Sequence, residues 1–218
     1  MGQYFLWYNH EKKAYVDAFD FNDNVKIGGY LHTSTEINNV LLMYLMNEWK
    51  GTKVVCFGDY WDPDETDNAF LKKIYEEIHD NPSDYAQFEC ENVAVYFKDS
   101  WKEEFISEYE SCLKYSSEYH GPDLSDPRCF TRDVEFVKYV INHDKHEYYD
   151  RFSKHLCDGG KERWFDPTAM LLLAGGGYNE PQFGMWIGDD VEATNDDAYV
   201  QSLEYEDCTQ KYCGPLFL

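Results

Sequence analysis

The chain has 218 residues, of which 43% are hydrophobic, and a formal net charge of −23. This apolar content is sufficient for a folded core and argues against a disordered chain. No apolar run has the length of a membrane span, and the acidity argues against binding to nucleic acid or to anionic membranes. The seven cysteines are irregularly spaced, which favours free thiols and a soluble protein of the reducing cytoplasm.

The first sixty residues predict a hairpin, a helix and a strand. Residues 4–17 are β-prone and contain polar turn residues at positions 9–12. A capping box at Thr33 precedes an apolar stripe with helical period, and this helix is expected to end near Glu48. The apolar residues 53–57 predict a short buried strand.

The middle of the chain predicts a helix, a strand and a second helix. Thr66 is the expected N-cap of the first helix, and Pro82 its end. Residues 93–97 alternate as a strand does, Ser100 begins a second capping box, and residues 120–127 have the composition of a linker. The buried face of the first helix is predicted to contain Leu71, Ile74, Tyr75 and Ile78.

The third part of the chain repeats the order of the first. Residues 134–141 predict a strand, residues 142–145 a turn and residues 147–150 a returning strand. An apolar run follows at residues 169–174. Residues 194–218 are acidic and are expected to be mostly irregular.

Two sequence patterns recur in the same order. Asn-His-x-Lys-x-x-Tyr-x-Asp occurs at residues 9–17 and 142–150, and Trp-x-Gly-x-x-Val follows at residues 49–54 and 186–191. The conserved order of two unrelated patterns favours an internal duplication. We therefore predict an α+β fold that contains two degenerate copies of a hairpin–helix–strand unit.

The predicted boundaries follow from this repeat. The two units would occupy residues 1–60 and 132–193. An acidic helix–strand–helix insertion would lie between them at residues 61–131, and an acidic tail would follow at residues 194–218. One unit of about 60 residues would be marginally stable alone, so the two are expected to share a core or a sheet.

Several segments resemble one protein family. They are the opening Met-Gly-Gln-Tyr at residues 1–4, the Gly-Asp-Tyr at residues 58–60 and the Asn-His-x-Lys-x-Glu-Tyr within residues 139–148. The family has a similar opening and also carries a glycine-rich stretch and a Trp-x-Gly segment, but the stretch at residues 175–179 here lacks the family's arginine. No activity is known for the family, so the resemblance implies a fold unit and no chemistry.

The repeated Asn-His-x-Lys element has two interpretations. It could form a paired binding site, or it could be a hairpin turn in which asparagine adopts a positive φ and lysine faces solvent. A turn is the simpler interpretation, because a fold element needs two copies and a catalytic site rarely does. The residues concerned are Asn9, His10, Lys12, Asn142, His143 and Lys145.

The sequence predicts no metal site, cofactor or catalytic group. The loop at residues 62–67 lacks the glycine and glutamate of an EF-hand, and the glycines at 175–177 are not followed by Lys-Ser or Lys-Thr. No nucleophile motif occurs. Four potential zinc ligands lack the paired spacing of a structural zinc site. They are His143, His146, His155 and Cys157.

Residues 61–132 contain 18 acidic and 7 basic residues. This excess favours a non-catalytic interaction protein that binds a basic partner, as an inhibitor, a nucleic-acid mimic or an assembly subunit. A second interpretation is that the charge only maintains solubility. A third is a cation-dependent hydrolase or small-ligand binder that uses Asp59, Asp62 and a histidine. The predicted partner-binding residues are Asp62, Asp64, Glu65, Asp67, Glu76, Glu77, Glu103 and Glu104.

Overall fold

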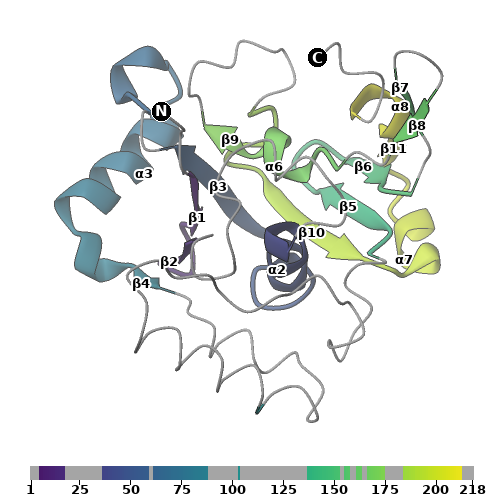
Figure 1. Cartoon of the computed structure of the whole chain (residues 1–218), viewed down its shortest axis with the longest axis horizontal. Helices are drawn as coiled ribbons and strands as arrows, with labels where there is room; N and C mark the ends of the chain where they lie inside the picture. The colour runs from purple at the N-terminus through teal and green to yellow at the C-terminus, as the bar shows by residue number, and fades with distance from the viewer. Residues whose placement is uncertain are drawn as a thin grey trace.

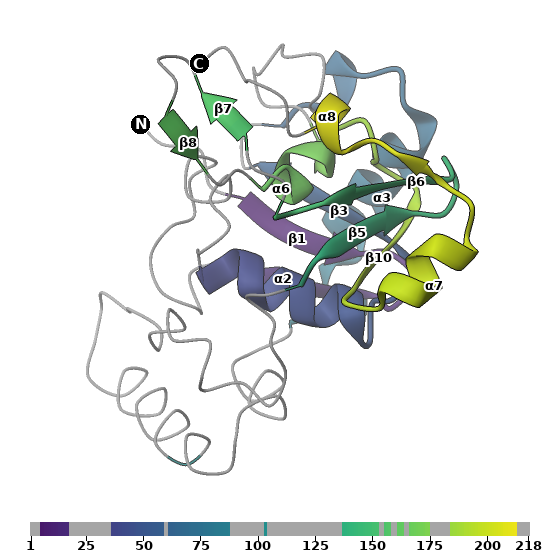
Figure 2. The same cartoon turned by 90° about the vertical axis from the view of Figure 1, so that its right-hand side faces the viewer.

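The fold is a mixed α/β arrangement in which five short helices, among the described residues, surround one large mixed sheet (Figure 1; Figure 2). It is seen in a computed structural model. The residues that the structure describes are 5–17, 36–58, 61–87, 103, 137–152, 155–157, 161–163, 166–174 and 184–212.

Nine strands form the sheet, in the order β11-β6-β5-β10-β3-β1-β2-β4, and β9 pairs with β3 beside this path. β7 and β8 form a separate antiparallel pair. The strands are β1 (Phe5–Asn9), β2 (Ala14–Asp17), β3 (Thr52–Gly58), β4 (Ala86–Gln87), β5 (Tyr139–Asn142), β6 (Glu147–Asp150), β7 (His155–Cys157), β8 (Lys161–Arg163), β9 (Leu173–Ala174), β10 (Asp190–Thr194) and β11 (Glu206–Asp207).

The centre of the sheet is a short antiparallel contact between β3 and β10. Lys53 pairs with Asp190 and Thr52 with Val191. The hairpin β1–β2 continues the sheet beyond β3, and the hairpin β5–β6 continues it beyond β10. At the two ends, β4 and β11 pair in parallel with β2 and β6. The strands that lie next to one another therefore come from distant parts of the chain.

The helices lie on both faces of this sheet. Helices α2 (Glu36–Met46), α6 (Thr168–Leu171) and α8 (Thr209–Tyr212) contribute to one apolar cluster, and α3 (Ala69–Asp80) contributes to a second one. Successive side chains of a strand point to opposite faces, so Val54 and Cys56 join the first cluster whereas Val55 and Phe57 join the second. Helix α7 (Asp197–Ser202) lies beside β5, where Tyr139 donates a hydrogen bond to Asp197.

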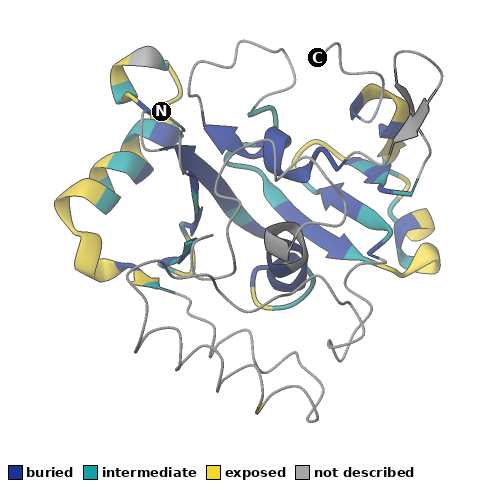
Figure 3. Cartoon of the chain, in the orientation of Figure 1, coloured by how far each residue is buried: buried dark blue, intermediate teal, exposed yellow. Residues whose placement is uncertain are grey.

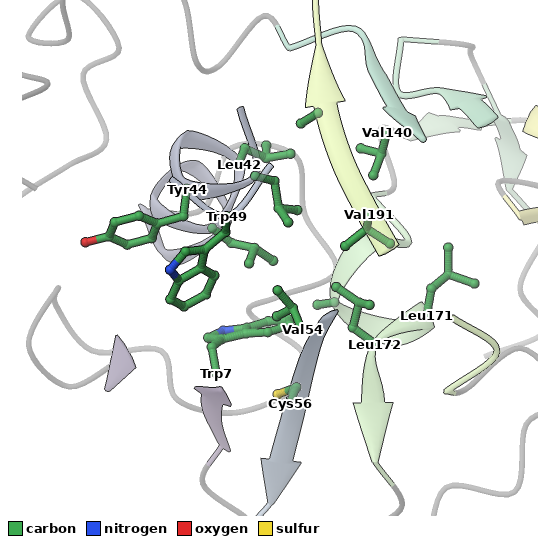
Figure 4. Close-up of a cluster of buried hydrophobic side chains, with 14 of the residues drawn as sticks. Trp7, Leu42, Tyr44, Trp49, Val54, Cys56, Val140, Leu171, Leu172 and Val191 are labelled. Atoms are coloured by element: carbon green, nitrogen blue, oxygen red, sulfur yellow. The ribbon is translucent and has the colours of Figure 1, made fainter. Parts of the chain in front are cut away.

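The first cluster is the main core (Figure 4). Helix α2 packs against β10 near the middle of the sheet (Figure 1), and every residue from Val40 to Leu45 is buried. The predicted apolar stripe is therefore too narrow, because the six consecutive apolar residues from Val40 to Leu45 are buried on every side of the helix. Trp7, Trp49 and Trp186 are among the largest fully buried side chains.

The predicted hairpins, central strand and first acidic helix are confirmed. β1 and β2 lie within residues 4–17, β3 contains residues 53–57, and β6 covers residues 147–150 as predicted. Helix α3 ends at Asp80, before Pro82 as predicted.

The N-cap of α3 was wrongly predicted. Asn68 caps the helix, because its Oδ1 accepts hydrogen bonds from the amides of Phe70 and Leu71. Thr66 instead accepts a hydrogen bond from the Asn68 amide, so it positions the cap rather than providing it.

Other predictions differ from the structure or lie outside it. Within residues 134–141, the strand β5 begins only at Tyr139, and the tail contains α7, β11 and α8 within its described residues. The strand at 93–97 and the linker at 120–127 lie outside the described residues, as does the helix after Ser100 apart from Glu103. The domain boundaries stay predictions, although β4 and β11 join the common sheet.

One buried ion pair links the turn after β6 to the start of α6. Arg151 and Asp166 are both fully buried. The Arg151 Nε and Nη2 atoms each lie 2.8 Å from Asp166 Oδ2, and Nη1 donates to the Val137 carbonyl at 2.7 Å. Asp166 Oδ1 accepts a hydrogen bond from the Thr168 amide at 3.0 Å. This geometry satisfies both charges within the core.

Replacing Arg151 by methionine is expected to lower the free energy of unfolding by about 3–5 kcal/mol, because the Asp166 charge would stay buried without its partner. Urea denaturation followed by circular dichroism measures this loss. Lys73→Met is the matched control, since Lys73 is exposed and should cost far less. Equal losses in the two variants would contradict this role of the ion pair.

Candidate functional site

The first hairpin turn is organised by Asn9. This residue is buried at the end of β1, where its Oδ1 accepts the Lys12 amide at 2.9 Å and its Nδ2 donates to Thr52 Oγ1 at 2.7 Å. The positive φ of the turn belongs to Lys13, at 49°. The prediction of a turn is therefore right, but the asparagine closes the turn with its side chain rather than adopting the positive φ.

The second hairpin turn has the same geometry. Asn142 Oδ1 accepts the Lys145 amide at 2.9 Å, and Asn142 Nδ2 donates to Asp189 Oδ2 at 2.8 Å. The positive φ belongs to His146, at 55°. Lys145 also forms an ion pair with Asp189, so this lysine is bound to the protein rather than facing solvent alone.

Each turn places a histidine against a tyrosine that precedes an edge strand. The Nδ1 atom of His10 lies 3.4 Å from the Tyr85 hydroxyl, next to β4. The Nδ1 atom of His143 lies 3.3 Å from the Tyr205 hydroxyl, next to β11. Both histidines therefore hold an edge strand of the sheet to the adjacent hairpin.

The two histidines differ in the carboxylate that they face. His10 lies 3.5 Å from Glu77 of α3, which is partly exposed and also pairs with Lys13. His143 Nε2 lies 3.1 Å from Oε2 of Glu192, whose side chain is only 3% exposed. The histidine–carboxylate pair at the first hairpin turn is thus partly exposed, and the one at the second hairpin turn is nearly buried.

Glu192 is the most unusual charged residue of the described chain. Its Oε2 also lies 3.6 Å from the ammonium of Lys50, whereas Oε1 is buried and accepts no hydrogen bond from any described residue. Burial raises the pKa of this carboxyl. The hydrogen bond with His143, the charge of Lys50 and a hydrogen bond with Tyr199 lower the pKa by more than burial raises it, so the pKa lies below its ordinary value. Burial and the charge of Glu192 raise the pKa of the neighbouring Tyr199 to about 12.

The corresponding position in the other half is apolar. Val55 pairs with Tyr8, the residue before Asn9, and Glu192 pairs with Ile141, the residue before Asn142. Val55 belongs to the second apolar cluster. If the two sequence patterns are aligned, the position of the Glu192 carboxylate therefore corresponds to a hydrophobic residue of β3.

We call Lys50, His143, Glu192, Tyr199 and Tyr205 the Glu192 site. Of these residues, sequence reasoning found only His143. A signal was present, because aligning the two Trp-x-Gly-x-x-Val patterns places Glu192 opposite Val55 and Lys50 opposite Ile187. The contacts of Tyr199 and Tyr205 depend on the positions of α7 and β11, which no local pattern predicts.

Five of the predicted partner-binding residues lie on α3 or in the segment just before it, and Figure 3 shows that the outer side of α3 is exposed. They are Asp62, Asp64, Asp67, Glu76 and Glu77. Asp62, Asp64 and Asp67 are exposed at and beside a 3₁₀ turn at Pro63–Glu65, where Asp62 accepts the Asp64 amide at 2.9 Å. Glu76 is exposed on α3, whereas Glu77 is partly covered.

The structure describes only some of the remaining predicted residues. Glu103 is exposed, the side chain of Glu65 is not described, and Glu104 and Asp59 lie outside the described residues. No group of three or more His, Cys, Asp or Glu residues in the described part of the chain is placed to hold a metal ion. The backbones of His155 and Cys157 lie in β7, but their side chains are not described.

Comparisons with protein-family models, with curated proteins and with solved structures found no match to this chain. Among the described residues, no helix has both the length and the apolar character needed to cross a membrane.

The lowered pKa of Glu192 predicts the pH dependence of its contribution to stability. A carboxyl whose pKa is lowered by folding stabilises the protein above its unfolded-state pKa, near 4.5, and loses that contribution as the pH falls through its folded pKa. The wild type should therefore lose stability relative to Glu192→Gln as the pH falls from about 5 to about 3. Urea denaturation across this range measures the difference.

The exposed Glu76→Gln variant is the control for this experiment. Two outcomes would contradict the lowered pKa. In one, the difference in free energy of unfolding between wild type and Glu192→Gln does not change with pH. In the other, the wild type becomes more stable relative to Glu192→Gln as the pH falls.

Proposed function

We propose that this chain is a non-catalytic interaction protein that binds a basic partner through an acidic face on α3 and its flanking turns. Binding of this kind suits an inhibitor that mimics nucleic acid, or an assembly subunit. The acidic face consists of Asp62, Asp64, Asp67, Glu76, Asp80 and Asp84, which are all exposed.

The lack of internal partners for all of these carboxylates except Asp80, which lies 3.7 Å from His79, supports the proposal. Residues 61–87 contain eight acidic and two basic residues. Within the described residues, none of Asp62, Asp64, Asp67, Glu76 and Asp84 forms an ion pair. Their charges therefore add to one negative potential, which attracts a cationic surface and speeds its association.

The shape of α3 is consistent with this use. One side of the helix packs into the second apolar cluster through Leu71 and Ile74, and the opposite side is exposed (Figure 3). The helix is thus held by its apolar side, while Glu76 and Asp80 stay available to a partner. The cation-dependent hydrolase stays an alternative prediction, since Asp59 lies outside the described residues.

We also propose that residues 1–60 and 132–193 are two copies of one unit. The registers of their strands support this duplication. Asn9 pairs with Ala14 and Asn142 with Glu147, each five residues further along the chain. Asn9 also pairs with Val54 and Asn142 with Val191, the last residues of the two Trp-x-Gly-x-x-Val patterns. In the central pair, Lys53 opposite Asp190, each residue is the counterpart of the other, as a two-fold axis at this point requires.

The duplication predicts that the two turn asparagines have equal roles. Asn9→Ala and Asn142→Ala each remove the acceptor of a turn amide and the donor to a neighbouring strand. Each should lower the free energy of unfolding by about 1–3 kcal/mol, measured by urea denaturation, and the two losses should be similar. A large loss in one variant and none in the other would contradict the equivalence.

The acidic face predicts binding that depends on both charge and position. The triple variant Asp64→Asn, Asp67→Asn, Glu76→Gln should bind a lysine-rich peptide of about twelve residues roughly tenfold more weakly than the wild type at about 50 mM salt, with a smaller salt dependence. Fluorescence anisotropy of a labelled peptide measures the affinity.

The control variant Glu48→Gln, Glu204→Gln, Glu206→Gln removes the same number of exposed charges away from α3. It should retain most of the affinity. The same loss in both variants would show that only net charge matters, and absence of binding by the wild type would refute the proposed function.

A further inference from the structure

Glu192 combines deep burial with an unsatisfied acceptor. The residue is only 2% exposed, and its Oε1 accepts no hydrogen bond of normal geometry from any described residue, although an interaction with the Tyr199 hydroxyl contributes to the lowered pKa of the carboxyl. A buried carboxylate oxygen without a donor is costly and therefore rare in native proteins. A donor supplied from outside the chain would remove this cost.

Gly51 lies next to the strand that carries Glu192 and has open space at its Cα among the described residues. The Gly51 amide donates to the carbonyl of Val191, so this glycine lies directly beside the strand that carries Glu192. Gly51 and Gly188 each lie two residues after a tryptophan and have positive φ, at 63° and 80°. A Cβ added at Gly188 would lie 2.7 Å from the Phe70 ring, whereas one added at Gly51 would meet no atom of the described residues within 4 Å. No described residue occupies at Gly51 the place that Phe70 occupies at Gly188.

Lys50 places a cation beside the Glu192 carboxylate. Its ammonium lies 3.6 Å from Glu192 Oε2 and 5.1 Å from the centre of the Tyr199 ring. Its side chain is 48% exposed and leaves Glu192 Oε1 unpaired, so the lysine satisfies the site only in part. An exposed lysine of this kind is held weakly and can be displaced.

The tyrosines beside Lys50 and His143 are suited to a flat cation. The Tyr205 ring stacks on His146, with centroids 4.8 Å apart, and meets His143 edge to face. The Tyr199 ring already carries a cation over its face. Tyrosine faces beside a carboxylate attract a guanidinium by cation–π and ionic interactions together.

We infer that the Glu192 site binds an arginine side chain of the basic partner, which displaces the ammonium of Lys50. A guanidinium presents several donors in one plane, so it can donate to Oε1, the oxygen that Lys50 leaves unpaired. A partner lysine would only repeat the contact that Lys50 already makes. This inference rests on the proposed function, because it names the residue by which the basic partner is anchored.

The test uses the full chain and three peptides of about nine residues, identical except for one central residue that is arginine, lysine or the uncharged arginine analogue citrulline. Dissociation constants are measured by NMR, with the ring signals of His143 as the reporter of the site. The arginine peptide should bind at least about fivefold more tightly than the other two, and its binding should shift the His143 signals.

Two variants distinguish the site from general electrostatics. Glu192→Gln should remove the preference for arginine. Lys50→Met should strengthen binding of the arginine peptide several-fold, because the competing ammonium is gone. Lys73→Met removes the same charge from α3 and should change the affinity much less. Lys50 is exposed, so its variant tests the site even if Glu192→Gln does not fold.

The outcomes separate this inference from the proposed function. Equal affinity for the arginine and lysine peptides, or equal effects of Lys50→Met and Lys73→Met, would overturn the inference while the lysine-rich peptide still binds the acidic face. Failure of the wild type to bind any of the basic peptides would overturn both.

Discussion

The antiparallel contact between β3 and β10 is the constraint on which the rest of the structure depends. It consists of two residue pairs, and it joins two hairpins that are separated by more than one hundred residues in the sequence. Lys53 lies at this junction, where its ammonium is 3.3 Å from Asp190 and donates to the Gly188 carbonyl at 2.8 Å. A contact this short needs support from packing, and α2 supplies it by lying against β10 and burying its apolar residues in the shared core (Figure 4).

The same junction determines where the Glu192 site can form. Lys50 and Gly51 come from the turn that precedes β3, whereas His143 and Glu192 come from the other side of the sheet centre. Only the pairing of β3 with β10 brings these parts of the chain together. The fold and the proposed arginine site are thus consequences of one strand register.

The acidic residues fall into groups that differ in burial and in ion pairing. Buried or partly buried carboxylates have partners, as Asp166 has in Arg151 and Glu147 has in Lys211. The exposed carboxylates of α3 have few partners and keep their negative potential. Glu192 belongs to neither group, because one of its oxygens is paired and the other is not. An unbalanced buried charge of this kind is a stronger indication of binding than surface acidity alone.

The sequence alone determined the local elements of this protein. The β-prone segments around 9–12 and 142–145 predict both hairpins, and the apolar face of residues 69–80 predicts α3, because these signals depend on periodicity and turn chemistry within a few residues. Only the tertiary structure decided that β3 pairs with β10, that Asn68 rather than Thr66 caps α3, and that Glu192 meets His143 and Lys50. These features depend on strand register and on contacts between distant segments, which a local pattern does not encode.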